Sequence, residues 1–222
     1  MIGLQILERT RAAGPGLVQA FSALPVANVS DCMSRMTAAG PRIRPMHRGG
    51  RLCGPALTVK TRPGDNLMIH QALEMAKPGD VIVVDGGGDL TNALIGELMT
   101  TYAQSRGVAG FVINGAIRDL DVIGAGAFPV FAAGVSHRGP YKDGPGEINT
   151  PIAIDGMVIH PGDLMLGDAD GVLCVPLDGA GDVLKAAQAK VSAEKKTLED
   201  IAAGRLDQSW IAVTLARIGY KA

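Results

Sequence analysis

Three charged residues around the segment NGAIRD have types that suit the binding of a carboxylic acid and a metal ion. Arg118 and Asp119 are adjacent and follow the apolar run VAGFVIN, and twenty residues separate Glu97 from Arg118. Arginine offers a planar fork for a carboxylate, and aspartate offers a hard oxygen ligand for Mg²⁺ or Mn²⁺. A second acid can act as a base or orient a water molecule. The three residues together indicate a site for a metal-chelating 2-keto acid.

The chain before Arg118 has the pattern of a strand, a helix and a second strand. VIVVD (81–85) is a β-branched run, NALIGELMTTYAQSRG (92–107) has helical periodicity and ends in glycine, and VAGFVIN (108–114) resembles a buried strand. We therefore predict an α/β fold with a parallel βαβ unit at residues 81–114 and a right-handed crossover. Ligands bind at the carboxyl ends of such strands, so we expect Glu97 and Arg118 at one functional edge.

The start of the predicted helix is open between Thr91 and Gly96. If the helix begins at Gly96, the amides of Glu97, Leu98 and Met99 have no partner within the helix and can bind a carboxylate. If it begins at Thr91, Glu97 is an ordinary exposed residue. The two starts are equally compatible with the sequence.

Two of these features also have a plainer interpretation. Arg118 and Asp119 can be a surface ion pair, which contributes at most about 1 kcal/mol to stability. The turn GGGD (86–89) resembles a nucleotide-binding glycine turn, but Asp89 and Leu90 interrupt the GxGxxG pattern, and an acid would face a phosphate. We favour a tight turn in which the backbone passes close to a neighbour.

Composition and charge favour a soluble protein that binds small molecules. The 222 residues are 47% hydrophobic and carry a formal net charge of −1, with no block of like charges, so neither nucleic acid nor a membrane is an expected partner. The three cysteines are far apart and odd in number, which is typical of reduced thiols. The N-terminus has charges where a signal peptide needs an apolar centre, so we expect a cytoplasmic location.

The distribution of glycine and proline along the whole length predicts a single domain over residues 1–222. We expect a helical N-terminal segment over about 1–40, short strands separated by PGD turns from Leu52 onward, and C-terminal helices over about 179–218. Glu194 falls on the late helix. From the residues alone it is either a surface residue or one that reaches a neighbouring site, and the surface interpretation is favoured.

The segment from VIVVDGGGD to NGAIRDLDVI, preceded by PGDN and followed by PGDLMLGDADGVLCVP, resembles one known family. This family contains the class II 4-hydroxy-4-methyl-2-oxoglutarate/4-carboxy-4-hydroxy-2-oxoadipate aldolases and the regulator of ribonuclease activity A; its older label is demethylmenaquinone methyltransferase. The resemblance extends from about Ser30 to the C-terminal helix. It implies an α/β/α sandwich with a swivelling β-sheet core, assembled as a homotrimer or a dimer of trimers with sites between subunits.

The aldolases of that family are marked by an acid, twenty residues and then Arg-Asp, which Glu97, Arg118 and Asp119 match. The resemblance implies that Arg118 binds the pyruvyl carboxylate with the amides from Gly96 to Met99, and that Asp119 holds the divalent metal. It also implies that Glu194 reaches the metal-bound waters of a neighbouring subunit. The departure is Glu97, where the characterised aldolases have aspartate; the glutamate side chain is longer by one methylene.

The expected function is therefore a lyase dependent on Mg²⁺ or Mn²⁺ that cleaves a C–C bond of a pyruvyl substrate. Its reaction would be retro-aldol cleavage, oxaloacetate decarboxylation or both, with Glu97 and Arg118 as catalytic residues. The alternative is a non-catalytic, protein-binding regulator of ribonuclease activity. As that branch is understood to lack the acid after the arginine, Asp119 favours the enzyme.

Overall fold

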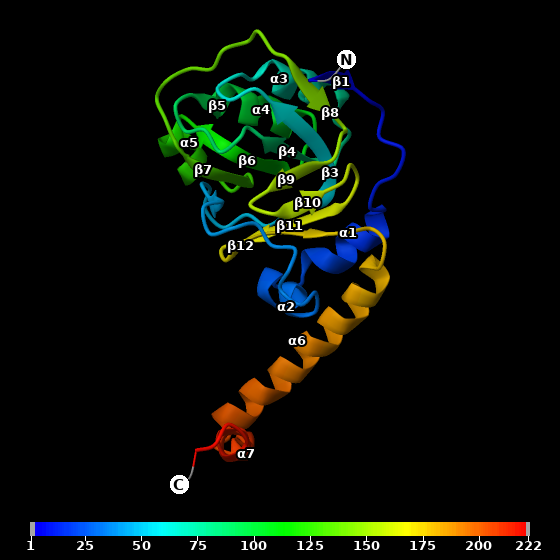
Figure 1. Ribbon diagram of the computed structural model, residues 1–222, viewed down its shortest axis with the longest axis vertical. Coiled ribbons are helices and arrows are strands. Elements are labelled where there is room, and N and C mark those ends of the chain that lie inside the picture. Colours follow the sequence, from blue (N-terminus) through cyan, green and yellow to red (C-terminus); the bar gives the residue numbers. More distant parts are fainter. Residues whose placement is uncertain (1–2, 221–222) are drawn as a thin grey trace.

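A mixed sheet with a parallel centre carries the predicted βαβ unit. The computed structural model describes residues 3–220, and within them ten strands form one sheet while β9 and β10 form a separate hairpin (Figure 1). The strands are β1 (Leu4–Ile6), β2 (Arg44–Pro45), β3 (Leu52–Thr61), β4 (Val81–Asp85), β5 (Ala93–Ile95), β6 (Gly110–Ile117), β7 (Val130–Val135), β8 (Gly146–Ile148), β9 (Ile152–Ile154), β10 (Met157–Ile159), β11 (Leu164–Asp168) and β12 (Gly171–Val175).

The order of the main strands is β1-β8-β3-β4-β6-β7-β2. The central strands β3, β4, β6 and β7 run parallel, so their carboxyl ends meet at one edge. Strand β3 joins the two parts of the sheet. Its first residues pair with β11 and its later residues, from Ala56, pair with β4.

Within residues 3–220 the chain also has seven helices. They are α1 (Pro15–Ser22), α2 (Val26–Asp31), α3 (Leu67–Met75), α4 (Glu97–Ser105), α5 (Leu120–Ala125), α6 (Ala180–Ala202) and α7 (Ser209–Arg217). Helix α3 packs on β3, β4 and β8, the hairpin β9–β10 packs on the opposite face of β3 and β4, and α1 and α2 contact β11. The arrangement confirms the predicted α/β class and the fold that the family resemblance implied.

The parallel βαβ unit is confirmed, and its helix begins later than residue 92. Strands β4 and β6 pair in parallel from Val81 with Gly110 to Asp85 with Asn114. Helix α4 starts at Glu97 with Gly96 as its N-cap, because the buried residues Ala93–Ile95 form β5 against β6 instead of a first helical turn. Of the two starts left open by the sequence, the one at Gly96 is therefore correct.

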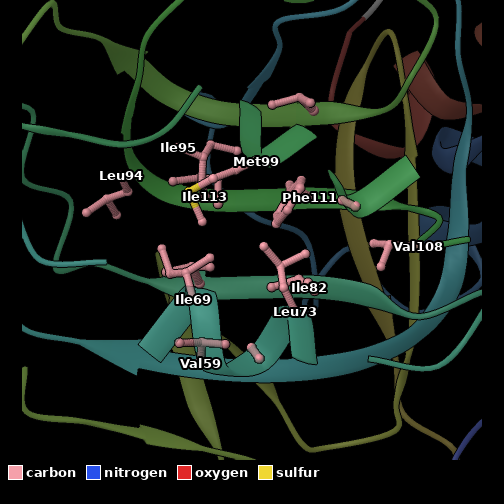
Figure 2. Packing of buried hydrophobic residues seen from close by; sticks show 14 of the residues in the cluster. Val59, Ile69, Leu73, Ile82, Leu94, Ile95, Met99, Val108, Phe111 and Ile113 are labelled. Carbon is pink, nitrogen blue, oxygen red and sulfur yellow. The ribbon is translucent and has the colours of Figure 1, made fainter. Parts of the chain in front are cut away.

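The core beside the functional edge is formed by α3, α4 and the sheet. Figure 2 shows Ile69 and Leu73 of α3 against Val59 and Ile82 of the sheet. These side chains are at most 1% exposed, and burying one such side chain stabilises the fold by roughly 1.5–3 kcal/mol. The loops at the carboxyl edge are thus held by a packed layer.

The two ends of the chain differ in how they pack. The segment predicted as helical over 1–40 contains β1, α1 and α2, with irregular chain between β1 and α1. The C-terminal helices α6 and α7 form an arm that leaves the body next to α1 and α2 (Figure 1).

Residues 1–2 and 221–222 lie outside the described residues. Across residues 3–220, no helix has the length and apolar character needed to cross a membrane.

Candidate active site

Two neighbouring turns bring Gly96, Arg118 and Asp119 together at the carboxyl edge of the sheet. Strand β5 leads into Gly96 and strand β6 leads into Arg118, and the two strands pair in parallel at Ile95 and Ile117. The backbone N–H of Arg118 donates to the carbonyl of Ile95 at 3.0 Å. The twenty residues between Glu97 and Arg118 therefore consist mainly of helix α4 and strand β6, and the chain returns to the edge from which it started.

Asp119 links the two turns through its carboxylate. It adopts the left-handed conformation, with φ 57° and ψ 40°, as the N-cap of α5. Its Oδ2 atom accepts a hydrogen bond of 2.9 Å from the backbone N–H of Glu97 and lies 3.7 Å from Nε of Arg118. A carboxylate at the first amide of α4 also interacts favourably with the positive end of the helix dipole.

Position 96 is a glycine because there is no room for a Cβ atom there. Its φ of −156° is ordinary extended backbone, so another residue could adopt it. A Cβ atom there would collide with Oδ2 of Asp119 and lie 2.9 Å from Cγ of Arg118. A glycine therefore allows the two charged side chains to lie against the start of α4.

The predicted amide site is partly occupied by the protein itself. The N–H of Glu97 donates to Asp119, and the N–H of Met99 donates to the carbonyl of Gly96 at 3.1 Å. Among the three amides predicted to bind a carboxylate, that of Leu98 is the one left for a ligand. The side chain of Leu98 is 81% exposed, so the approach to this amide is open.

A cavity of about 110 Å³ adjoins the start of α4. Gly96, Leu98, Met99, Arg118 and Asp119 are among its lining residues, whereas the exposed Glu97 is not. The side chains of Arg118 and Asp119 are 43% and 39% exposed, so both can meet a ligand from solvent. Glu97 thus lies on the rim, from which it can act through a water molecule rather than by direct contact.

The same cavity contains three polar residues that sequence reasoning missed, namely Asn66, His70 and Lys142. Asn66 is 2% exposed; its Nδ2 donates to the carbonyl of Leu94 at 2.9 Å, and its buried Oδ1 has no hydrogen-bond partner in the described structure. Burial and the nearby Lys142 ammonium lower the pKa of His70 below its usual value. The PGDN turn after β3 was the available signal for Asn66. No sequence pattern points to Lys142.

Asp65 holds the loop that carries Lys142. Its buried carboxylate accepts backbone hydrogen bonds from Leu67 (2.9 Å), Asp143 (2.7 Å) and Gly144 (2.9 Å), and its Oδ2 lies 3.2 Å from Nη2 of Arg62. Burial by itself raises the pKa of Asp65, but the three backbone donors and Arg62 prevail and hold it below its usual value. Asp65 therefore positions one wall of the cavity.

The residues present suit a hard divalent cation that keeps most of its water. Among the described residues no group of three or more His, Cys, Asp or Glu side chains could hold a metal ion. Asp119 has one oxygen engaged by Glu97 N–H, and its Oδ1 remains for a ligand. Mg²⁺ is commonly bound by one or two carboxylates together with waters and substrate oxygens, so the donor set fits that ion.

Glu194 lies away from this cavity within its own chain. It sits on α6, where Oε2 accepts a 2.5 Å hydrogen bond from Asn28 Nδ2 and Oε1 lies 3.1 Å from Lys190 Nζ. The Asn28 hydrogen bond and then Lys190 lower the pKa of Glu194. Lys190 also pairs with Asp31 at 3.0 Å. The structure therefore does not bring Glu194 to Arg118 within one subunit.

The GGGD turn is filled by protein atoms. A Cβ at Gly86 would lie 2.7 Å from Cδ1 of Leu94, and one at Gly88 would lie 3.1 Å from Nη1 of Arg42. Gly87 and Gly88 both have φ of 71°, which glycine adopts without strain. The tight-turn interpretation of this segment is therefore supported.

Comparison with known proteins shows which family this chain is similar to. The model of a family described as RraA-like: Aldolase/RraA matches residues 26–174. A protein from Halalkalibacterium halodurans, provisionally named as a 4-hydroxy-4-methyl-2-oxoglutarate aldolase, is 41% identical over 170 residues, which cover 77% of this chain and 81% of that protein.

Two solved structures show the same fold. An uncharacterized protein from Pseudomonas syringae pv. tomato str. DC3000 is 29% identical, with a TM-score of 0.78, and the match covers 88% of this chain and 96% of that one. The RNA-processing inhibitor RraA from Thermus thermophilis is 30% identical, with a TM-score of 0.63, and the match covers 68% of this chain and 92% of that one.

Proposed function

This chain belongs to the RraA-like (Aldolase/RraA) family, and within that family we propose that it is a divalent-metal-dependent lyase for pyruvyl substrates. The observation that carries the proposal is the position of Asp119. Its carboxylate is held by the first amide of α4 and lies beside Arg118, while its second oxygen remains for a metal ligand. The aldolase name of the Halalkalibacterium halodurans relative supports the same class of reaction.

The chain's own residues would bind and orient the substrate. The Arg118 guanidinium and the Leu98 amide would bind the carboxylate of the 2-keto acid, and Oδ1 of Asp119 would be the protein ligand for Mg²⁺ or Mn²⁺. When bound there, Mg²⁺ or Mn²⁺ would supply a Lewis acid for the charge that develops on the keto oxygen as the C–C bond breaks. Glu97, at the cavity rim, moves the proton through a water molecule.

The cavity also suits a substrate with more than one carboxylate. Lys142 brings a second cation into the cavity lined by Arg118. We propose 4-hydroxy-4-methyl-2-oxoglutarate, 4-carboxy-4-hydroxy-2-oxoadipate and oxaloacetate as substrates, cleaved by retro-aldol reaction or decarboxylation. All three carry a 2-keto carboxylate and at least one further carboxylate.

The test is pyruvate release from each of these substrates, with and without EDTA. We expect turnover with added Mg²⁺ or Mn²⁺, loss of turnover with EDTA and recovery when metal is returned in excess. Turnover of all three substrates that persists in EDTA would contradict the metal mechanism. Absence of pyruvate release with every substrate and metal would contradict the lyase.

The second candidate is a protein-binding regulator of ribonuclease activity, which the similarity to the Thermus thermophilis inhibitor favours. It requires no metal and no keto acid. Inhibition of a ribonuclease by the Asp119→Ala variant, together with absence of lyase activity in the wild-type protein, would favour the regulator. Asp119 directly after Arg118 favours the enzyme, because a regulator has no use for a metal ligand at that position.

For the assembly we propose a homotrimer or a dimer of trimers, with Glu194 acting at the metal-bound waters of a neighbouring subunit. Glu194 is 50% exposed on the outer part of α6, so a second subunit can approach it. Light scattering measures the assembly, and a stable monomer with full lyase activity would remove Glu194 from the site.

We also propose a cytoplasmic location, because Cys32, Cys53 and Cys174 are free thiols.

A further inference from the structure

Another cavity, of about 760 Å³, lies at the edge of the sheet opposite to Arg118. Arg9 lines it and pairs with Asp80, which directly precedes β4, so the cavity adjoins the amino ends of the parallel strands. Its lining residues come from several segments that are distant in sequence, and none of them lines the Arg118 cavity. Ligand cavities in proteins commonly have volumes of about 300–1,000 Å³, so this one has room for a small molecule.

The chain between β1 and α1 contributes one wall of this cavity (Figure 1). We call residues 7–13 the N-terminal strap. At its start, Nδ2 of Asn149 donates to the carbonyl of Leu7 at 2.8 Å, and at its end the N–H of Ala13 donates to the carbonyl of Gly162 at 3.0 Å. The loops that follow β8 and β10 therefore hold both ends of the N-terminal strap.

The middle of the N-terminal strap is anchored by Arg9. Its Nη2 lies 2.7 Å from Oδ1 of Asp80, and its Nη1 donates to the carbonyl of Ala56 at 3.2 Å. The side chains of Arg9 and Asp80 are 12% and 3% exposed, so separating them would leave an uncompensated charge in a poorly solvated place. The wall is thus fixed before any ligand arrives, as is usual for small-molecule sites.

The lining of the cavity has an excess of negative charge. It contains two arginines and three acids, namely Arg9, Arg11, Glu8, Asp163 and Asp178. Arg9 is neutralised by Asp80, and Nη2 of Arg11 lies 2.9 Å from Oδ1 of Asp178. The charges of Glu8 and Asp163 therefore remain, and they favour a cationic ligand over an anionic one.

Asp163 is the buried member of this pair, at 3% exposed. Its Oδ2 accepts the backbone N–H of His160 at 3.0 Å, and its Oδ1 accepts that of Leu177 at 3.1 Å. These donors satisfy the oxygen atoms but are neutral, so the carboxylate keeps its charge beside the cavity. Glu8 is exposed at the mouth and can contact a ligand directly.

The rest of the lining combines a polar acceptor with apolar surface. Asn149 is 8% exposed, and its buried Oδ1 has no hydrogen-bond partner in the described structure, which marks a place where the chain supplies no donor. The apolar lining residues are Met36, Val158, Pro161 and Pro176. Among the described residues that line the cavity there is no Phe, Tyr or Trp, so the aromatic cage that suits quaternary ammonium ions is missing.

From this volume, charge and lining we infer that the cavity binds an organic cation that has N–H donors on a ring body, of the amine or amidine class. The ring would lie against the apolar residues beside Val158, and the N–H groups would face the acidic side with Glu8. Because Arg118 and Asp119 take no part, this is a second ligand site, separate from the proposed lyase site.

The experiment compares three ring compounds of similar size with the full chain. Benzamidine is a cation with N–H donors, benzyltrimethylammonium is a cation without them, and benzoate is an anion. Ligand-observed NMR titrations give each dissociation constant, and hydrogen exchange of residues 7–13 and 156–163 locates the bound molecule. None of these readouts uses a keto acid or a metal ion, so the outcome is independent of the proposed lyase activity.

Two variants test the cavity itself, each with the same substitution elsewhere as its control. Val158→Trp places a large side chain at an exposed lining position, and Val213→Trp makes the same change on α7. Glu8→Gln removes one of the two remaining charges, and Glu199→Gln removes an exposed charge on α6. Retained protection of the β3, β4 and β6 amides shows that each variant is folded.

We expect benzamidine to bind with a dissociation constant on the order of 1 mM, more tightly than benzyltrimethylammonium by about fivefold or more, while benzoate does not bind. Val158→Trp should weaken benzamidine binding by at least about tenfold, and Glu8→Gln by roughly two- to fivefold, since an exposed ion pair contributes little. The two controls should match the wild type.

Three results would overturn the inference. They are benzamidine that does not bind at concentrations on the order of 10 mM, benzoate or benzyltrimethylammonium that binds as tightly as benzamidine, and wild-type benzamidine affinity in Val158→Trp or Glu8→Gln. Slower exchange only outside residues 7–13 and 156–163 would also overturn it, because the cation would then occupy another place.

Discussion

The backbone N–H of Glu97 donates a 2.9 Å hydrogen bond to Oδ2 of Asp119, across the two turns that follow β5 and β6. The contact links Glu97 at the start of α4 to Asp119 after β6. Glu97 contributes its main-chain amide and Asp119 contributes its carboxylate. The Glu97 carboxylate takes no part in this contact, and Asp119 has one oxygen held by it and one available. The consequences can be tested one residue at a time.

Asp119→Asn should separate the structural role of this residue from metal binding. The asparagine oxygen can still accept the Glu97 hydrogen bond, but a neutral amide is a poor ligand for Mg²⁺. We expect a folded protein whose pyruvate release falls by at least about 100-fold at any practical metal concentration. Titration calorimetry with Mn²⁺ should show loss of binding. Wild-type turnover by Asp119→Asn would refute Asp119 as the metal ligand.

Arg118→Lys should lower kcat/KM by on the order of tenfold to a hundredfold, and Arg118→Ala by more. Lysine keeps the charge but loses the planar fork, and a hydrogen bond to a charged group contributes roughly 1.5–3 kcal/mol. The fold should persist, because the side chain is 43% exposed on a turn. Steady-state kinetics with oxaloacetate and the 4-hydroxy-2-oxo acids measure the effect. If both variants match the wild type, Arg118 is an ordinary surface residue.

Gly96→Ala should reduce activity through steric displacement alone. The added Cβ collides with Oδ2 of Asp119, so the carboxylate or the start of α4 must shift. We expect kcat/KM to fall by about tenfold or more, since small misplacement of catalytic groups is costly. Gly181→Ala is the control, because its Cβ meets nothing within 4 Å. Equal kinetics for the two variants would show that the site tolerates the shift.

Asp65→Asn should destabilise the protein at neutral pH by about 3 kcal/mol, because an amide cannot satisfy the same set of N–H donors. Three backbone donors and Arg62 converge on the buried carboxylate. Chemical denaturation measures the change in free energy of unfolding. Asp178→Asn, at a side chain that is 91% exposed, should change it little. A stability loss no larger than that of the control would contradict the anchoring role.

The same variant has a defined pH dependence. The pKa of Asp65 is lowered in the folded protein, so its contribution is present above the unfolded pKa of about 3.9 and is lost as pH falls through the lower folded value. The stability difference between wild type and Asp65→Asn should therefore be constant near neutral pH and shrink only in acid. A difference that shrinks between pH 8 and pH 6 would point to another group.

The sequence predicted the central unit correctly because its signals are local. β-branched runs at 81–85 and 108–114 and a glycine-terminated periodic segment between them require no distant partner to be recognised. The start of α4 was ambiguous for the opposite reason. Residues 93–95 form β5 only because β6 offers a paired edge, and that edge is a tertiary feature.

The sequence by itself determined which chemical groups this protein has at the functional edge, namely an acid, an arginine and an aspartate at the ends of paired strands. Only the tertiary structure decided how they meet. It directs Asp119 to a main-chain amide, brings Asn66 and Lys142 from distant loops into the same cavity, and leaves Glu194 on an arm away from it. The physical reason is that strand and helix patterns depend on neighbours in sequence, whereas a cavity depends on which loops the sheet order makes adjacent.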